Sequence, residues 1–118
     1  MAHITAHLVN AADGTHASGV TVTLYLLKAD GTRSEHSRAV ADHEGRFRIE
    51  VDRSGCPADD RYELTIAIAS YFEAQGFRRQ GLQVVDEVVI RLAMPDPDAR
   101  YHFPITLAPN FSSVWWSS

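Results

Sequence analysis

The amino-acid sequence predicts an all-β domain, a sandwich of two packed β-sheets with one short helix, and three observations support this fold class. Apolar and polar residues alternate along several short stretches, which is the period of a strand with one buried face. Turn signals built from Gly, Pro, Asp and Ser separate these stretches by about ten residues, giving about seven or eight strands. No stretch keeps a helical period for more than about two turns.

The first half of the chain is expected to form four strands joined by tight turns. The alternation predicts them at residues 4–9, 19–27, 34–41 and 46–51. Turns are expected at Asp13-Gly14, Asp30-Gly31 and Glu44-Gly45. The third of these strands is the most polar, so we expect it near the edge of a sheet.

The second half is expected to hold three more strands, at residues 61–69, 82–94 and 100–107, after a loop at residues 52–60. Between the first two, Ser70 is expected to cap a short helix that Gly76 ends. The strand over residues 82–94 is expected to carry a bulge at Asp86-Glu87. Pro104 lacks a backbone N–H, so its strand is expected to lie at a sheet edge or to bulge there.

The chain ends in the sequence Trp115-Trp116-Ser117-Ser118. Two exposed tryptophans would form a costly apolar patch, so this tail is expected to pack inside a pocket or in a subunit interface. In the preceding strand, His102 is expected on the face away from the core.

Length and composition restrict the kind of protein. With 118 residues, one cysteine and a formal net charge of −4, the chain is expected to form a single domain spanning residues 1–118. The acidic balance argues against general nucleic-acid binding. A lone cysteine allows no intrachain disulfide and no four-cysteine zinc site. No apolar stretch long enough to span a membrane and no signal-peptide pattern is seen, so a cytoplasmic protein is the expectation.

Two of the six histidines stand out. His7 and His102 each interrupt a strand, and each shares its outward face with a threonine, Thr5 or Thr106. Paired imidazoles suit proton transfer or metal binding, although the pattern alone favours a half-buried strand histidine bonded to a backbone carbonyl. The other histidines are expected to be solvated, His16 among them. No third ligand accompanies the pair, so no metal is expected.

Arg46 and the terminal aromatics each allow two interpretations. An outward-facing arginine is usually a solvated cation or part of a surface ion pair, but its guanidinium can also hold an anionic or carbonyl-rich ligand. Phe111 and the Trp115-Trp116 pair can stack on a flat heterocycle or pack in an interface. The sequence pattern alone leaves both questions open.

Three segments, taken together and in order, resemble one known family. They are Ile4-Thr5-Ala6-His7-Leu8-Val9-Asn10, Asp42-His43-Glu44-Gly45-Arg46 and Tyr101-His102-Phe103-Pro104-Ile105-Thr106-Leu107-Ala108-Pro109. With Gly19-Val20-Thr21-Val22-Thr23-Leu24, Tyr62-Glu63-Leu64 and Tyr71-Phe72, these segments make the chain similar, almost end to end, to the transthyretin-related proteins, the 5-hydroxyisourate hydrolase family.

The resemblance implies a transthyretin-like sandwich that assembles as a homotetramer, a dimer of dimers, with clefts between the dimers. In the hydrolases two histidines and an arginine line this cleft, and their positions match His7, His102 and Arg46. The implied reaction opens a lactam in a small urate-derived heterocycle and needs no cofactor. His7 would activate water, His102 would relay a proton to the leaving nitrogen, and Arg46 would polarise the carbonyl.

The tail departs from the family pattern. Where the hydrolases have Tyr-Arg-Gly-Ser lining the cleft, this chain has Trp115-Trp116-Ser117-Ser118, expected to bind substrate in a smaller and more apolar pocket. Asn10, Arg100 and the segment Arg78-Arg79-Gln80 depart as well. Three functions therefore remain open: a 5-hydroxyisourate hydrolase, an enzyme for a more hydrophobic cyclic substrate, or a non-catalytic carrier of a flat aromatic ligand.

Overall fold

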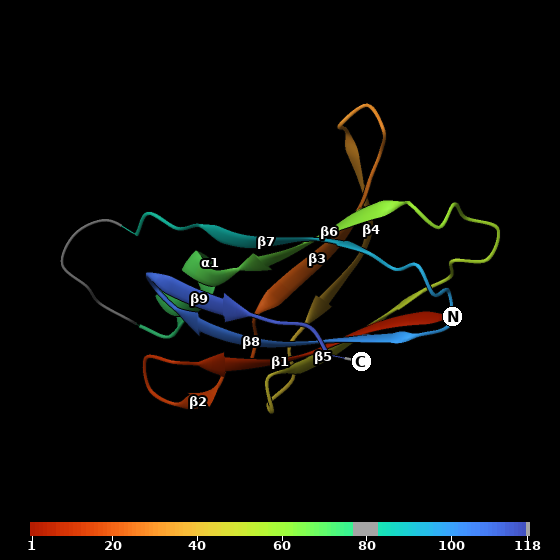
Figure 1. The fold of residues 1–118 in the computed structure, drawn as a ribbon. Helices are drawn as coiled ribbons and strands as arrows, with labels where there is room; N and C mark the ends of the chain where they lie inside the picture. The colour runs from red at the N-terminus through yellow and green to blue at the C-terminus, as the bar shows by residue number, and fades with distance from the viewer. Residues whose placement is uncertain (77–82, 118) are drawn as a thin grey trace.

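A computed structural model describes residues 1–76 and 83–117 and shows two β-sheets packed face to face, with one short helix at one end (Figure 1). The first sheet holds β1 (Ala2–Asn10), β2 (Thr15–His16), β5 (Arg46–Val51), β8 (Arg100–Ala108) and β9 (Phe111–Val114). The second holds β3 (Thr21–Leu27), β4 (Arg33–Val40), β6 (Arg61–Ala67) and β7 (Glu87–Ala93). The helix α1 spans Ile68–Ala74. The predicted all-β sandwich with one short helix is confirmed.

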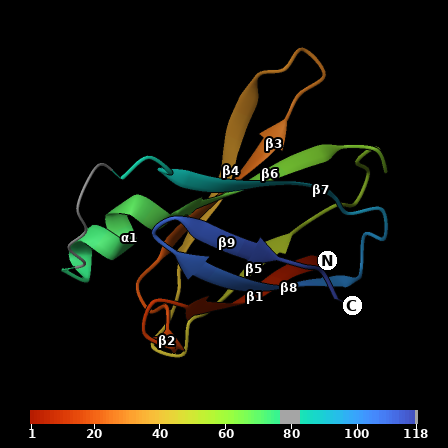
Figure 2. The same cartoon turned by 60° about the vertical axis from the view of Figure 1, so that its left-hand side comes forward.

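Strand β1 organises the first sheet. Strand β8 runs parallel to it on one side, and β9 pairs with the far edge of β8. On the other side, β5 pairs antiparallel with β1 from Ala2 to His7, and the two-residue strand β2 pairs with its last two residues. Figure 2 shows β1, β5 and β8 side by side, with the β2 turn at one end. The second sheet is antiparallel in the order β4-β3-β6-β7, and β4 lies at an edge as predicted.

The alternation read from the sequence decides which face of each strand enters the core. In β1 and β8 every second residue is buried, among them Ile4, Leu8, Ile105 and Leu107. Each such side chain stabilises the fold by about 1.5–3 kcal/mol relative to leaving it in water. The residues between them, His102 included, therefore point to the outer face of the first sheet. His102 lies on the face away from the core, as predicted.

The junction between β6 and the helix differs from the prediction. Strand β6 ends at Ala67 and the helix begins at Ile68, because Ile68, Tyr71 and Phe72 share a helical face that is buried. The N-cap residue is Ala67 and no side chain caps the helix, so Ser70 is not the cap.

The predicted strand at 82–94 is too long. Strand β7 begins at Glu87, and its pairing with β6 is continuous, so no bulge occurs at Asp86-Glu87. The only register shift in the second sheet lies between Leu24 and Tyr25 of β3, within the described pairings. Leu82 and the Arg78-Arg79-Gln80 segment fall outside the described residues. Gly76, with φ +71°, follows the helix as expected.

The prediction that Pro104 lies in an edge or bulged strand is wrong. Strand β8 lies between β1 and β9, and Ile105 pairs with Val114 in the same register as the isolated His102–Ser117 bridge. The Pro104 carbonyl accepts a hydrogen bond from the Trp115 N–H at 3.4 Å, but Pro104 has no backbone N–H to donate to Trp115. The missing donor accounts for the gap in the ladder between Val114 and Ser117, so a proline is tolerated here inside a sheet.

Among the described residues, no helix has the length and apolar character needed to cross a membrane.

Candidate active site

The strand register brings the three predicted residues onto one face. His7 of β1 lies directly opposite Arg46 of β5, and Thr5 of β1 lies directly opposite His102 of β8. Thr5 and His7 are two residues apart and so point to the same side of the sheet. Directly opposed residues in an antiparallel pair have Cβ atoms about 4.5–5.5 Å apart. The outer face of the first sheet therefore carries two imidazoles and a guanidinium from three adjacent strands.

The His102 ring is held by its neighbour on β1. Its Nδ1 lies 2.9 Å from the Thr5 hydroxyl oxygen, which leaves Nε2 available to a ligand. The backbone of His102 is also fixed, because it exchanges two hydrogen bonds of 3.0 and 2.8 Å with Ser117. Residue Ser117 of the predicted substrate-binding tail is thus tied to His102 through its main chain.

Arg46 follows a tightly bonded turn. The Asp42 carboxylate accepts bonds from the backbone N–H groups of Glu44 at 2.9 Å and Arg46 at 3.0 Å, and these bonds hold its pKa below the ordinary value. Gly45 in this turn has φ +74°, and its Cα faces the carbonyl of Leu8 so closely that an added Cβ would lie 2.3 Å from that oxygen. The turn fixes the Arg46 backbone, while its half-exposed guanidinium forms an ion pair with Glu44 at 4.0 Å.

A shallow depression of about 300 Å³ lies over these strands. Its lining residues come from β1, β5, β8 and the turn before β5: Thr5, Ala6, Asp42, Arg46, Phe47, Arg48, Arg100 and His102. Three of them are arginines and one is acidic, so the depression is positively charged and suits an anionic ligand.

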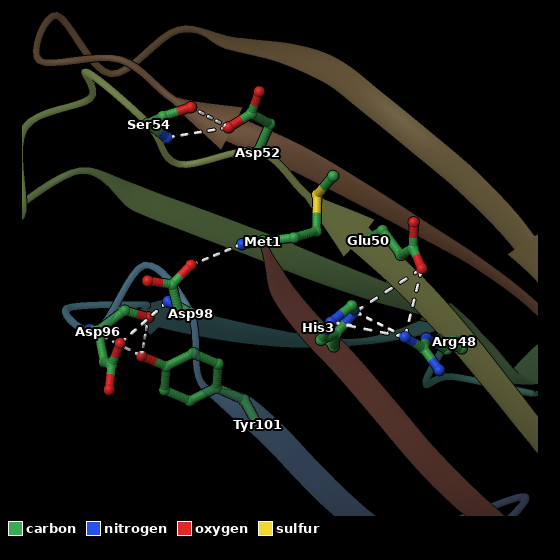
Figure 3. Close-up of polar contacts among 9 residues, drawn as sticks. All are labelled: Met1, His3, Arg48, Glu50, Asp52, Ser54, Asp96, Asp98 and Tyr101. Carbon is green, nitrogen blue, oxygen red and sulfur yellow. Dashed lines mark hydrogen bonds and ion pairs between the residues drawn. The ribbon is translucent and has the colours of Figure 1, made fainter.

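The two additional arginines differ in their contacts. Arg48 bonds to Glu50 at 3.3 Å and to His3 Nδ1 at 3.1 Å, and Figure 3 shows these three side chains meeting where β1 and β5 lie side by side. Among the described residues, no acidic group lies within ion-pair distance of Arg100. Its guanidinium is therefore free to meet a charge on a ligand.

The surroundings of both histidines favour the neutral form of the ring. Burial lowers the pKa of His7 below its ordinary value, and the charges of Arg46, His16 and His102 lower it further, against an opposing effect of Glu44. Burial also lowers the pKa of His102, and the positive charges of Arg100 and Arg46 lower it further. A neutral imidazole accepts a proton, so both rings are suited to acid–base chemistry near pH 7.

One contact of His7 was not expected from the sequence. Its Nε2 lies 3.0 Å from Nδ1 of His16, and the ring centroids are 5.1 Å apart. His16 is exposed, as expected, and the two-residue strand β2 also places it opposite Val9, on the same side of β1 as His7. The only sequence signal was the Asp13-Gly14 turn, which folds the chain back along β1.

The tail tryptophans are not packed inside this chain. Trp115 and Trp116 are each 59% exposed, so the expected burial within a pocket of the chain is not found. Trp116 instead lines a second depression of about 350 Å³, next to Tyr101, Phe103 and residues of β7. Tyr101 and Phe103 point to the core side of β8, so Trp116 lies away from His102 and Arg46 within the single chain. Ser118 is outside the described residues.

Among the described residues, no group of three or more His, Cys, Asp or Glu side chains is arranged to hold a metal ion.

Comparison with known proteins gives concordant matches. A sequence profile of the HIUase/Transthyretin family matches residues 4–115. A 5-hydroxyisourate hydrolase from Deinococcus radiodurans is 32% identical over 116 residues, covering 98% of this chain and 95% of that one.

Solved structures share the fold. The 5-hydroxyisourate hydrolase of Klebsiella pneumoniae superposes with a TM-score of 0.72 at 25% identity, covering 98% of this chain and 99% of that one. Sea bream transthyretin in complex with thyroxine gives 0.76 at 18% identity, over 97% and 93% of the two chains. An (S)-allantoin synthase superposes with a TM-score of 0.77 at 23% identity. The match covers 99% of this chain but only 44% of the longer synthase.

Proposed function

The chain belongs to the HIUase/Transthyretin family, and from this premise we propose that it is a hydrolase that opens the cyclic amide of 5-hydroxyisourate. One observation carries the proposal: His7, Arg46 and His102, far apart in the chain, lie on one face of the sheet, where Arg46 and His102 line a positively charged depression. The relatives that match over nearly the whole chain are 5-hydroxyisourate hydrolases. We assign the three residues as catalytic.

Each of the three groups has a role in the proposed reaction. Neutral His7 takes a proton from water as the water oxygen attacks the ring carbonyl. Arg46 donates hydrogen bonds to the carbonyl oxygen and stabilises the negative charge that develops on it. The C–N bond then breaks, and His102 gives the leaving nitrogen a proton from Nε2 and takes a replacement proton from solvent, so that no imidazolate is left. The proton lost by the water balances the proton gained by the nitrogen, and solvent exchange resets the two rings.

The charge of the depression favours a polar substrate. The hydrolase-type tail arginine is Trp116 in this chain, which led us to expect a more apolar pocket. Arg48 and Arg100 supply two guanidiniums from β5 and β8 beside Arg46. An anionic, carbonyl-rich urate derivative suits this lining better than the hydrophobic cyclic substrate considered as an alternative.

We also infer that the protein assembles as a homotetramer in the cytoplasm. The exposed Trp115 and Trp116 favour burial between subunits, as do the outer edges of β7 and β9, which have no strand partner among the described residues. The free, exposed thiol of Cys56 suits a reducing compartment. Sedimentation of the purified protein tests the assembly: a lone monomer at micromolar concentration would contradict it.

The activity is tested by following the ring opening of fresh 5-hydroxyisourate by ultraviolet absorbance. We expect the protein to exceed the spontaneous rate, and His7→Ala, Arg46→Ala and His102→Ala to lower kcat by about 10²–10⁴-fold, the usual cost of losing an acid–base or charge-stabilising group. His43→Ala and Arg38→Ala are matched controls, because both side chains are exposed and absent from the lining of the depression. Equal rates for wild type and blank would overturn the proposal.

A further inference from the structure

The hydrogen bond between His7 and His16 gives the proposed base a partner of its own. His16 stands on β2, does not line the depression, and is exposed to solvent. The bond joins Nε2 of His7 to Nδ1 of His16 at 3.0 Å, within the normal range for N–H···N contacts. His7 Nδ1 and His16 Nε2 are the two nitrogens at the ends of this pair.

Only one proton can occupy the shared bond. If His7 Nε2–H donates to His16, His7 Nδ1 carries a lone pair and is a base. If His16 Nδ1–H donates to His7, then His7 Nδ1 carries a hydrogen and the lone pair moves to His16 Nε2. The two arrangements differ only by the positions of protons, and the pair remains neutral in both.

We propose that His16 is a positioning residue that holds His7 in the tautomer with a free Nδ1 and carries the proton taken from water out to solvent. This inference rests on the proposed hydrolysis, for which His7 is the base. As a water O–H bond breaks, a His7 Nδ1–H bond forms; the His7 Nε2 proton passes to His16 Nδ1, and His16 Nε2 releases its proton to bulk water. The electron pair of the broken O–H bond stays on the attacking oxygen.

The surroundings of His7 make such a route favourable. The charged or titratable groups facing His7 are Arg46 of β5, His16 of β2, His102 of β8 and Glu44 of the turn before β5. Of these, Arg46 carries a positive charge and His102 can carry one, and both line the depression. An imidazolium at His7 would be repelled by these charges, whereas passing the proton to exposed His16 and on to solvent removes the charge from His7.

Two substitutions separate proton transfer from simple orientation. His16→Phe removes the bond, and His16→Asn keeps an acceptor oxygen near the position of Nδ1 but cannot pass a proton on. We expect both to lower kcat for 5-hydroxyisourate by about tenfold, with KM changed by less than about twofold, because His16 does not touch the depression. His36→Asn, an exposed histidine on β4, is the matched control. A wild-type kcat in His16→Phe, or full recovery in His16→Asn, would overturn the inference.

A second measurement needs neither substrate nor folded variants. Nitrogen-15 NMR of the wild-type imidazoles should show His7 protonated at Nε2, with this proton bonded to His16 Nδ1. A His7 ring protonated at Nδ1 with Nε2 bare would overturn the inference. If the protein shows no hydrolysis at all, the proposed function fails, and the NMR result still decides whether the two rings share a proton.

Discussion

Arg46 of β5 lies directly opposite His7 of β1 in the antiparallel ladder of the first sheet. The guanidinium therefore stands beside the imidazole without bonding to it, and its charge adds to burial in lowering the pKa of His7. One residue thus serves two purposes in the proposed reaction: it binds the carbonyl oxygen and keeps the base unprotonated.

We expect Arg46→Gln to change the pH dependence as well as the rate. Loss of the charge lets the pKa of His7 rise, so the acid limb of the kcat/KM profile moves to higher pH. Loss of the oxyanion donor lowers kcat by about 10²–10³-fold. Steady-state kinetics from pH 5 to 8.5 measure both, with Arg38→Gln on β4 as the control. An acid limb that stays in place would contradict the placement of Arg46 beside His7.

The Thr5 hydroxyl is expected to matter through His102. Thr5→Val is nearly isosteric but removes the 2.9 Å bond to His102 Nδ1, so the ring loses its fixed orientation and tautomer. We expect kcat to fall by about fivefold, since a net hydrogen bond contributes about 1 kcal/mol. Thr106→Val is the matched control, because Thr106 lies on the same face of β8 but not in the lining of the depression. Equal kcat values for the two variants would show that the Thr5–His102 hydrogen bond does not orient His102 for catalysis.

Arg100→Gln is expected to weaken substrate binding more than chemistry. Its guanidinium lines the depression and no described acidic group pairs with it, so a charged substrate gains the contact directly. We expect KM to rise by about tenfold, the scale of one hydrogen bond to a charged group, and the pKa of His102 to rise because Arg100 lowers it in the wild type. Kinetics at low and high salt test this: an unchanged KM at low salt would argue against an anionic substrate contact.

Gly45 is expected to be the most sensitive glycine of the described turns. Gly45→Ala combines φ +74° with a Cβ that would meet the Leu8 carbonyl at 2.3 Å. The left-handed backbone alone costs about 1–2 kcal/mol, and the clash adds about 1–3 kcal/mol. Gly31→Ala is the matched control, because Gly31 has φ +86° but open space around it. Thermal unfolding should show a clearly larger fall in Tm for Gly45→Ala; equal shifts would mean that the turn relaxes away from Leu8.

The sandwich was predictable because most strands bury one face, and such a strand alternates apolar and polar residues. Strands without this alternation cannot be predicted from it. Strand β2 has two exposed residues and β9 is mostly exposed, so neither was predicted. Ile68 fits both the strand pattern before it and the helix after it, and only the packing of Tyr71 and Phe72 decides between them.

For the candidate site, the sequence predicted the strand face on which each histidine lies, but not which residues of neighbouring strands lie opposite it. Alternation placed His7 and His102 outward, yet it cannot say which residues of other strands lie opposite, because register depends on tertiary pairing. The resemblance supplied Arg46. Nothing in the pattern gave the Thr5–His102 bond or the His7–His16 bond, and Trp116 was expected near the catalytic groups but lies with Tyr101 and Phe103.

The lowered pKa values of His7 and His102 predict a loss of stability in mild acid. In the unfolded chain both rings titrate near pH 6.5, whereas in the folded protein they take up protons only at lower pH. Between these values the unfolded state binds more protons, so the free energy of unfolding rises with pH there and falls on acidification from about pH 6.5 downward. Urea denaturation at pH 7.5 and 5.5 should therefore show a lower midpoint in acid. The double variant His7→Gln/His102→Gln should reduce that difference, while His36→Gln should leave it as in the wild type. An unchanged difference in the double variant would show that other groups, rather than these two imidazoles, set the acid sensitivity.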